Sequence, residues 1–164
     1  IRAARAMLDL VKGGMIRSQV EWIDAILSDP KRTLLAICAL PEEMPVVEAI
    51  ELADRARTEA RVAVGVCFLN GTFPVPVTAR DTAVLERLAA GHARPASARL
   101  GGDVPALLVG AAIARRLHDD DRRHAARLRT RLRVPVVEVP RQVGLAAGLE
   151  TTRAVAASIA GIPV

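Results

Sequence analysis

The fold is decided by two consecutive stretches, TLLAICALPEEMPVVEAIELADRA (residues 33–56) and ARVAVGVCFLNGTFP (residues 60–74). Residues 33–39 form a continuous apolar run, which is typical of a parallel strand that is covered on both faces. A helix is expected next, because its first turn carries glutamates and the helix dipole favours carboxylates there. Residues 61–69 are again apolar and β-branched and lead to Asn70, so the two stretches predict a β-α-β unit with a right-handed crossover.

Size and composition predict one domain or a part of one. The chain has 164 residues, of which 51% are hydrophobic, and this is enough for one substantial core. It begins at Ile1 without an initiator Met, so we expect a processed, trimmed or partial chain. Cys38 and Cys67 fall inside the two apolar runs, which suits buried thiols in a reducing compartment. We see no signal peptide and no apolar run of roughly 18 residues, and we therefore expect a cytoplasmic location.

The charge balance is basic, with a formal net charge of +5 that comes almost entirely from arginine. Such a balance suits nucleic acid, anionic lipid or a phosphate-bearing ligand. Aromatic residues make up only 2% of the chain and tyrosine is absent, so side chains on which bases could stack are almost lacking. We therefore expect no nucleic-acid partner.

The rest of the chain is expected to be mainly helical, with one more strand. Apolar spacing and the glycines and prolines predict helices at 2–11, 18–27 (capped by Ser18), 81–90, 104–133 and 145–160, a mobile segment at 91–102 and a strand at 133–139. The aspartates at 119–121 offer a place where the long helix could break. In this reading the chain divides into helices (1–32), the β-α-β unit (33–74), a helical insertion (75–133), and a last strand and helix (134–164).

Three parallel strands are few for an independent sheet. They would leave the outer edges unpaired and the faces poorly covered. We therefore expect further strands elsewhere in the parent protein.

Two motifs contain suitable residue types without the required spacing. Lys12-Gly13-Gly14 lacks the Gly-Lys-Ser/Thr ending of a phosphate-binding loop and follows a helix instead of a strand, so an ordinary loop is predicted. In the charged segment HDDDRRH (residues 118–124), His118 and His124 lie six residues apart and should point to different faces of a helix, so a solvated, salt-bridged surface is predicted for the whole segment and not a metal site. No Ser/His/Asp or Cys/His arrangement supports covalent catalysis, and no catalytic residue is predicted.

Asn70 is the first candidate for ligand contact, because it follows a strand at the edge where parallel sheets bind ligands. Its carboxamide offers a donor and an acceptor in one plane, which suits an adenine edge. The alternative is a turn-forming Asn that bonds its own backbone. Pro140 and Arg141 hold the corresponding position after the third strand, where the arginine could stack on a base or face solvent.

The segments PEEMPVVEAIEL (residues 41–52) and VGVCFLN (residues 64–70) resemble an ATPase family. It includes the arsenite-pump ATPase and the tail-anchored-protein targeting ATPase, and the chain looks most like the bacterial members called anion-transporting ATPases. The segments SDPKRT (residues 28–33) and VVEVP (residues 136–140) resemble the family's approach to this unit and its last strand.

The resemblance implies the carboxyl-terminal half of one P-loop NTPase-like domain: a parallel sheet flanked by helices, with a helical insertion. The phosphate-binding loop and both switch segments would lie before Ile1. Asn70, Pro140 and Arg141 would contact the adenine. The full-length parent would be an ATP-hydrolysing enzyme with ATP and Mg²⁺ as cofactors, whereas this chain alone should not hydrolyse ATP.

The resemblance also implies partners. The parent would form a homodimer or a heterodimer with a paralogue, and residues 80–132 would face a membrane-protein client or a transporter. The zinc-binding Cys-x-x-Cys of some targeting members is absent, so no zinc-clamped dimer is implied. The alternative function is a non-catalytic partner-binding or regulatory module on the same scaffold.

Overall fold

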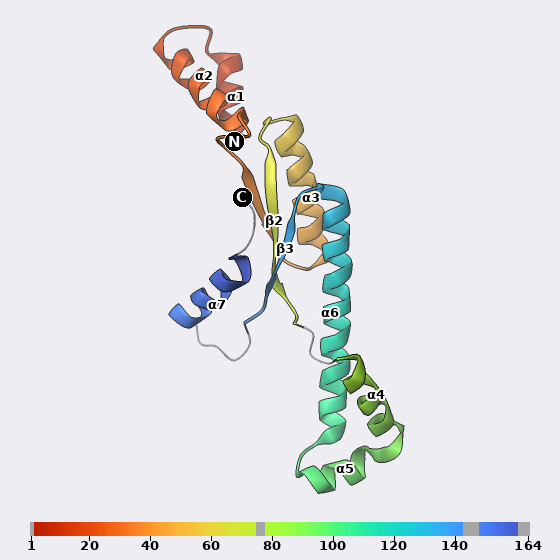
Figure 1. Ribbon diagram of the computed structural model, residues 1–164. Coiled ribbons are helices and arrows are strands. Elements are labelled where there is room, and N and C mark those ends of the chain that lie inside the picture. Colours follow the sequence, from red (N-terminus) through yellow and green to blue (C-terminus); the bar gives the residue numbers. More distant parts are fainter. Residues whose placement is uncertain (1, 75–77, 143–147, 161–164) are drawn as a thin grey trace.

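A three-stranded parallel sheet lies at the centre of the computed structural model, which describes residues 2–74, 78–142 and 148–160 (Figure 1). Its strands are β1 (Leu35–Ala39), β2 (Val64–Thr72) and β3 (Val136–Pro140), in that order across the sheet. Both neighbouring pairs are parallel, and α3 (Glu43–Thr58) joins β1 to β2. The prediction of a β-α-β unit is confirmed, and the protein is a mixed α/β structure whose parallel sheet is flanked by helices.

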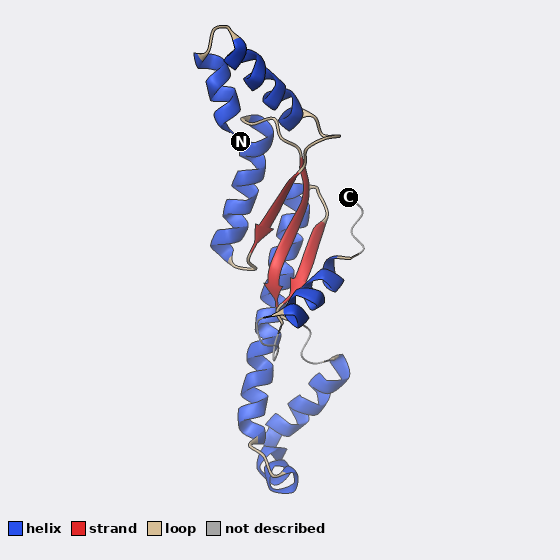
Figure 2. Ribbon diagram, turned by 90° about the vertical axis from the view of Figure 1, so that its left-hand side faces the viewer, coloured by secondary structure: helices blue, strands red, loops and turns tan. Residues whose placement is uncertain are grey.

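One face of the sheet is covered by α3 and by α6 (Val104–Leu132) (Figures 1 and 2). Both helices place apolar side chains at helical spacing against the strands. The resulting core contains Ile37, Val46, Ile50, Ala53, Cys67, Leu69, Leu128 and Leu132. Burying one leucine of this kind stabilises the fold by about 1.5–3 kcal/mol, so this face supplies most of the stability of the sheet.

The opposite face of the sheet is largely uncovered in the described part of the chain. α7 (Leu149–Ile159) contacts β3 and lies across the sheet from α3 and α6 (Figures 1 and 2). Leu34, Ala36 and Leu40, in and beside β1, remain exposed. The prediction that the first strand is covered on both faces is therefore wrong, because the helices that pack on β1 lie on one side of it.

The two free cysteines lie on opposite faces of the sheet. Cys67 pairs with Ile37 and is buried, whereas Cys38 pairs with Phe68 and is exposed, since successive residues of a strand point to opposite faces. The expectation of two buried thiols is right for Cys67 and wrong for Cys38. Burial, with a smaller contribution from Cys38, raises the pKa of the Cys67 thiol to about 11.

A helical arm extends beyond the carboxyl ends of the strands (Figure 1). It consists of α4 (Ala79–Arg87), α5 (Ala93–Leu100) and the first half of α6. The segment expected to be mobile at 91–102 instead contains α5. Gly91 (φ 121°) and Gly101 (φ 68°) supply left-handed backbone on either side of this helix, and the alanines between them favour it.

The long helix α6 is continuous past residues 119–121, so the suggested break does not occur. The side chain of Asp103 caps its start by accepting a hydrogen bond from the Ala106 amide at 3.1 Å. Arg133, in the left-handed region at φ 55°, ends it. One rigid element of 29 residues thus runs from the arm to the sheet.

A helical hairpin lies at the end of the sheet opposite the arm (Figure 1). It is formed by α1 (Arg2–Leu10) and α2 (Met15–Ser28). Gly14 (φ 85°) turns the chain into α2, which begins three residues before the predicted Ser18 cap, so that prediction is wrong. The predicted final helix is described as α7 from Leu149, and its expected start at residues 145–147 lies outside the described residues.

Candidate functional site

The carboxyl edge formed by β2 and β3 brings the three predicted ligand residues together. Asn70 pairs with Val139, and Thr72 pairs with Pro140, which directly precedes Arg141. The strand continues two residues beyond the predicted end at Asn70, so this side chain lies at the edge without terminating it. Ligands of parallel α/β sheets bind beyond such carboxyl ends, which makes this edge the first candidate site.

An irregularity in β2 shapes the edge. The register between β2 and β3 shifts between Asn70 and Thr72, and Gly71 between them has φ 84°. A β-bulge of this kind re-aims the neighbouring side chains. A Cβ at Gly71 would meet nothing within 4 Å, so the requirement for glycine comes from the backbone angle and not from lack of space.

Main-chain and side-chain hydrogen bonds hold the two strand ends together. The amide of Arg141 donates to the carbonyl of Thr72 at 2.8 Å, which extends the pairing past β3. Gln142 Nε2 donates to the carbonyl of Pro140 at 2.9 Å. Thr72 is buried, whereas Asn70 and Arg141 are exposed. The edge therefore has an ordered backbone and two polar side chains that a ligand can reach.

Phe73, the next residue after β2, is held by side chains from two other elements. Asp121 Oδ2, on α6, accepts a hydrogen bond from the Phe73 amide at 2.6 Å. His118 Nδ1 lies 2.9 Å from the Phe73 carbonyl oxygen and must carry a proton there, because a carbonyl only accepts. The Arg141 guanidinium carbon lies 4.8 Å from the centroid of the Phe73 ring, in cation–π range. We call Phe73, His118, Asp121 and Arg141 the Phe73 clamp.

Asp121 is a buried carboxyl group, with 4% of its surface exposed. Burial raises its pKa above the usual range. The hydrogen bond from the Phe73 amide and the charges of His118 and His124 oppose this rise, and Glu138 adds to it. Its environment therefore favours the protonated form more than water does.

Sequence reasoning missed His118 and Asp121 because it assigned the whole charged segment to a solvated surface. That prediction is wrong for Asp121. A signal was present in the helical spacing. Asp121 precedes Ala125 by four residues, and Leu128 and Leu132 follow Ala125 after three and then four more; these three apolar side chains are fully buried.

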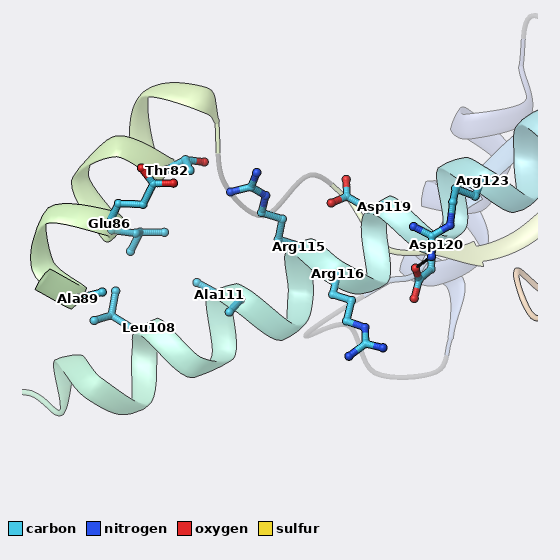
Figure 3. A pocket seen from close by; sticks show the side chains of 12 residues that line it. Thr82, Glu86, Ala89, Leu108, Ala111, Arg115, Arg116, Asp119, Asp120 and Arg123 are labelled. Carbon is cyan, nitrogen blue, oxygen red and sulfur yellow. Dashed lines mark hydrogen bonds and ion pairs between the residues drawn. The ribbon is translucent and has the colours of Figure 1, made fainter.

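A groove of about 450 Å³ between α4 and α6 is a second candidate site (Figure 3). Its apolar part is lined by Leu85 of α4, by Ala89 just after that helix, and by Leu108 and Ala111 of α6. Its charged part is lined by Glu86, Arg115, Arg116, Asp119, Asp120 and Arg123. Opposite charges are balanced there, and Arg123 pairs with Asp120.

Apolar side chains outside this groove are also exposed on the arm. Leu107, Val109 and Ile113 of α6 have exposed fractions of 65%, 61% and 56%. Apolar surface of this extent often marks an interaction site.

No protein-family model matches the chain, and no curated protein matches it significantly. In the described part of the chain, no three His, Cys, Asp or Glu side chains are grouped so that they could hold a metal ion. None of the described helices combines the length and the apolarity needed to cross a membrane.

Proposed function

We propose that this chain is the carboxyl-terminal half of an ATP-binding, ATP-hydrolysing enzyme similar to the arsenite-pump and tail-anchored-protein targeting ATPases. In this proposal it supplies the adenine side of the nucleotide pocket. The observation that carries the proposal is the arrangement of Asn70, Pro140 and Arg141 at one carboxyl edge, on neighbouring parallel strands.

Each of these residues has a role suited to a purine. The exposed carboxamide of Asn70 offers a donor and an acceptor in one plane, as the edge of adenine requires. Arg141 lies with its guanidinium over Phe73, and a base can stack against a guanidinium plane. Pro140 presents an apolar ring beside them. The backbone hydrogen bonds between Thr72 and Arg141 keep the two strand ends in place.

The phosphate chemistry belongs to the parent protein. The sequence contains no Gly-Lys-Ser/Thr motif, so we assign the phosphate-binding loop to a part of the protein outside this chain. Bound Mg²⁺ would neutralise phosphate charge during hydrolysis. The chain alone should therefore release no phosphate from ATP, and reproducible Mg²⁺-dependent release that survives repurification would contradict this assignment.

The arm is the proposed client or coupling region, facing a membrane-protein client or a transporter. The exposed Leu107, Val109 and Ile113 and the groove beside α4 support this role. We further propose that the parent acts in the cytoplasm as a homodimer or a heterodimer with a paralogue. The same exposed surface favours the second candidate function, a non-catalytic partner-binding or regulatory module.

Photolabelling with 2-azido-ADP, whose reactive group is on the base, tests the proposed pocket. Trypsin cleaves after arginine and should release residues 62–80, which contain Asn70, and residues 134–141, which contain Arg141. We expect label in these two peptides, with ADP competing better than GDP. Asn70→Ala and Arg141→Ala should reduce labelling, and Arg94→Ala in the arm is the matched control. In Arg141→Ala the second peptide runs from residue 134 to residue 153, because the cleavage site at 141 is lost. Label spread evenly over the chain, or equal competition by GDP, would favour the non-catalytic module.

A further inference from the structure

We propose that Asp121 and His118 are positioning residues of the purine site: they hold the main chain of Phe73 and thereby set where Arg141 and Asn70 lie. This inference rests on the proposed function for the identity of the ligand. The clamp geometry on which it stands is independent of that ligand.

The first argument is that the Phe73 main chain is held at both of its polar groups. Asp121 Oδ2 accepts a hydrogen bond from the Phe73 amide at 2.6 Å, and His118 Nδ1 donates one to the Phe73 carbonyl oxygen at 2.9 Å. These two side chains are three residues apart on α6 and so project from the same side of the helix. Two contacts of opposite polarity to one residue fix both the position and the rotation of its peptide planes.

The second argument concerns the cost of burying Asp121. A buried carboxyl group is unfavourable unless it is well bonded, and an apolar side chain would continue the buried face of α6 at lower cost. Ala125, Leu128 and Leu132 occupy the other positions of that face. What an apolar residue would not supply is the acceptor for the Phe73 amide. Compared with an apolar residue at this position, Asp121 therefore fixes the position of the main chain at the end of β2.

The third argument is that short contacts connect Phe73 to Arg141 and Asn70, the residues proposed to bind the purine. The Phe73 ring lies under the Arg141 guanidinium at 4.8 Å, and the preceding Thr72 carbonyl accepts from the Arg141 amide at 2.8 Å. Asn70 lies three residues before Phe73, across the bulge at Gly71. A shift of Phe73 therefore displaces Arg141 directly and Asn70 through the bulge.

The test uses the whole chain labelled with ¹⁵N. Asn70 is the only asparagine, and its carboxamide, the Arg141 Nε–H and the Phe73 amide are the three reporters. Asp121→Ala should move all three signals, because the acceptor is lost and the ring current at Arg141 changes. Asp121→Asn keeps an acceptor oxygen and should restore them towards wild type. Asp119→Ala, an exposed position on the same helix, is the matched control.

A titration with ADP separates this inference from the proposed function. If wild type binds ADP with shifts at Asn70 and Arg141, Asp121→Ala should weaken that affinity about tenfold, which corresponds to about 1.4 kcal/mol of binding free energy. If wild type shows no response to ADP, the proposed function fails. In that case the shifts of the three reporter signals in the variants still show whether the Phe73 clamp positions Asn70 and Arg141.

Two further variants keep the inference falsifiable if Asp121→Ala does not fold. His118→Ala removes the contact to the Phe73 carbonyl, and Phe73→Leu keeps the main chain but removes the ring under Arg141. We expect His118→Ala to move the Asn70 and Arg141 signals, and Phe73→Leu to move mainly that of Arg141. Unchanged Asn70 and Arg141 signals in folded Asp121→Ala or His118→Ala would overturn the inference.

Discussion

The two halves of α6 differ in how deeply their apolar side chains are buried, and the difference is the opposite of what their compositions suggest. Residues 104–114 contain no charged side chain, yet Leu107, Val109 and Ile113 are more than half exposed. Residues 121–132 are rich in arginine, yet their apolar positions at Leu128 and Leu132 are fully buried against the sheet. The comparison teaches that spacing, not apolar content, determines which part of a helix enters a core. It also separates a half of α6 that stabilises the fold from a half whose apolar surface is free for a partner.

Truncating one leucine in each half should give the largest difference. Leu128→Ala leaves a cavity in the core and should lower the free energy of unfolding by about 2–5 kcal/mol. Leu107→Ala removes a side chain that is 65% exposed and should change it by less than about 0.5 kcal/mol. Urea denaturation of both variants measures this contrast. Equal losses would show that the arm half is packed in solution.

Removing one aspartate tests the boundary between the halves. Asp121→Ala leaves the Phe73 amide without its acceptor and should cost about 1–3 kcal/mol of unfolding free energy. Asp119→Ala, on the exposed side of α6, is the control and should have little effect. Urea denaturation at neutral pH compares the two, and similar losses would contradict the burial of Asp121.

The pH dependence of Asp121 sharpens the same contrast. Burial raises its pKa in the folded protein above the ordinary value of 3.8, so the folded state holds the proton more tightly than the unfolded chain. Its contribution to stability should therefore fall as pH rises from about 4 through the folded-state pKa, and then stay constant. Asp121→Asn does not titrate and should gain stability relative to wild type over that interval.

Denaturation of wild type and Asp121→Asn at several pH values measures this difference. The other charged groups that act on Asp121, namely His118, His124 and Glu138, are present in both proteins, so the comparison isolates the Asp121 carboxyl group. Asp119→Asn is the control. A wild-type minus variant difference that is the same at every pH would show that Asp121 has an ordinary pKa.

The smallest effect is expected at Glu43, the first residue of α3, which pairs with Arg127 on the exposed side of the sheet-packed half of α6. Glu43 Oε1 accepts from Arg127 Nη1 at 2.6 Å, and this hydrogen bond, with the Arg127 charge, lowers the Glu43 pKa. The stabilisation is present above the unfolded-state pKa and is lost as pH falls through the folded one. Glu43→Gln should lower the melting temperature slightly at neutral pH and not in acid, as calorimetry can measure. A large decrease in melting temperature would mean that the Glu43–Arg127 pair is less accessible to solvent than its exposure in the structure indicates.

The parts of the fold that local pattern determines could be predicted. The apolar runs at 33–39 and 61–69 correspond to β1 and β2, and the helix between them was expected from its glutamates. α5 was missed, because its proline and the glycines around it suggested irregular chain, although Gly91 and Gly101 lie outside the helix, one on each side. The end of β2 was placed two residues early, since the bulge at Gly71 allows pairing to resume at Thr72.

The candidate site could be predicted only in part. Parallel strands bring their carboxyl ends to one edge, so the proximity of Asn70, Pro140 and Arg141 follows from topology. The Phe73 clamp depends on a contact across 48 residues, from Phe73 to Asp121, which the return path of the arm creates. Only the alignment of Asp121 with Leu128 and Leu132 indicated in advance that this aspartate turns inward.

The continuity of α6 has a thermodynamic consequence. At about 1.5 Å per residue this helix is some 43 Å long, and the clamp lies near its middle. If a partner bound to the arm displaces α6 and so changes the affinity of the strand ends for a purine, reciprocity applies. The purine must then change the affinity of the arm for that partner by the same factor. Measuring either effect alone would therefore give the magnitude of both.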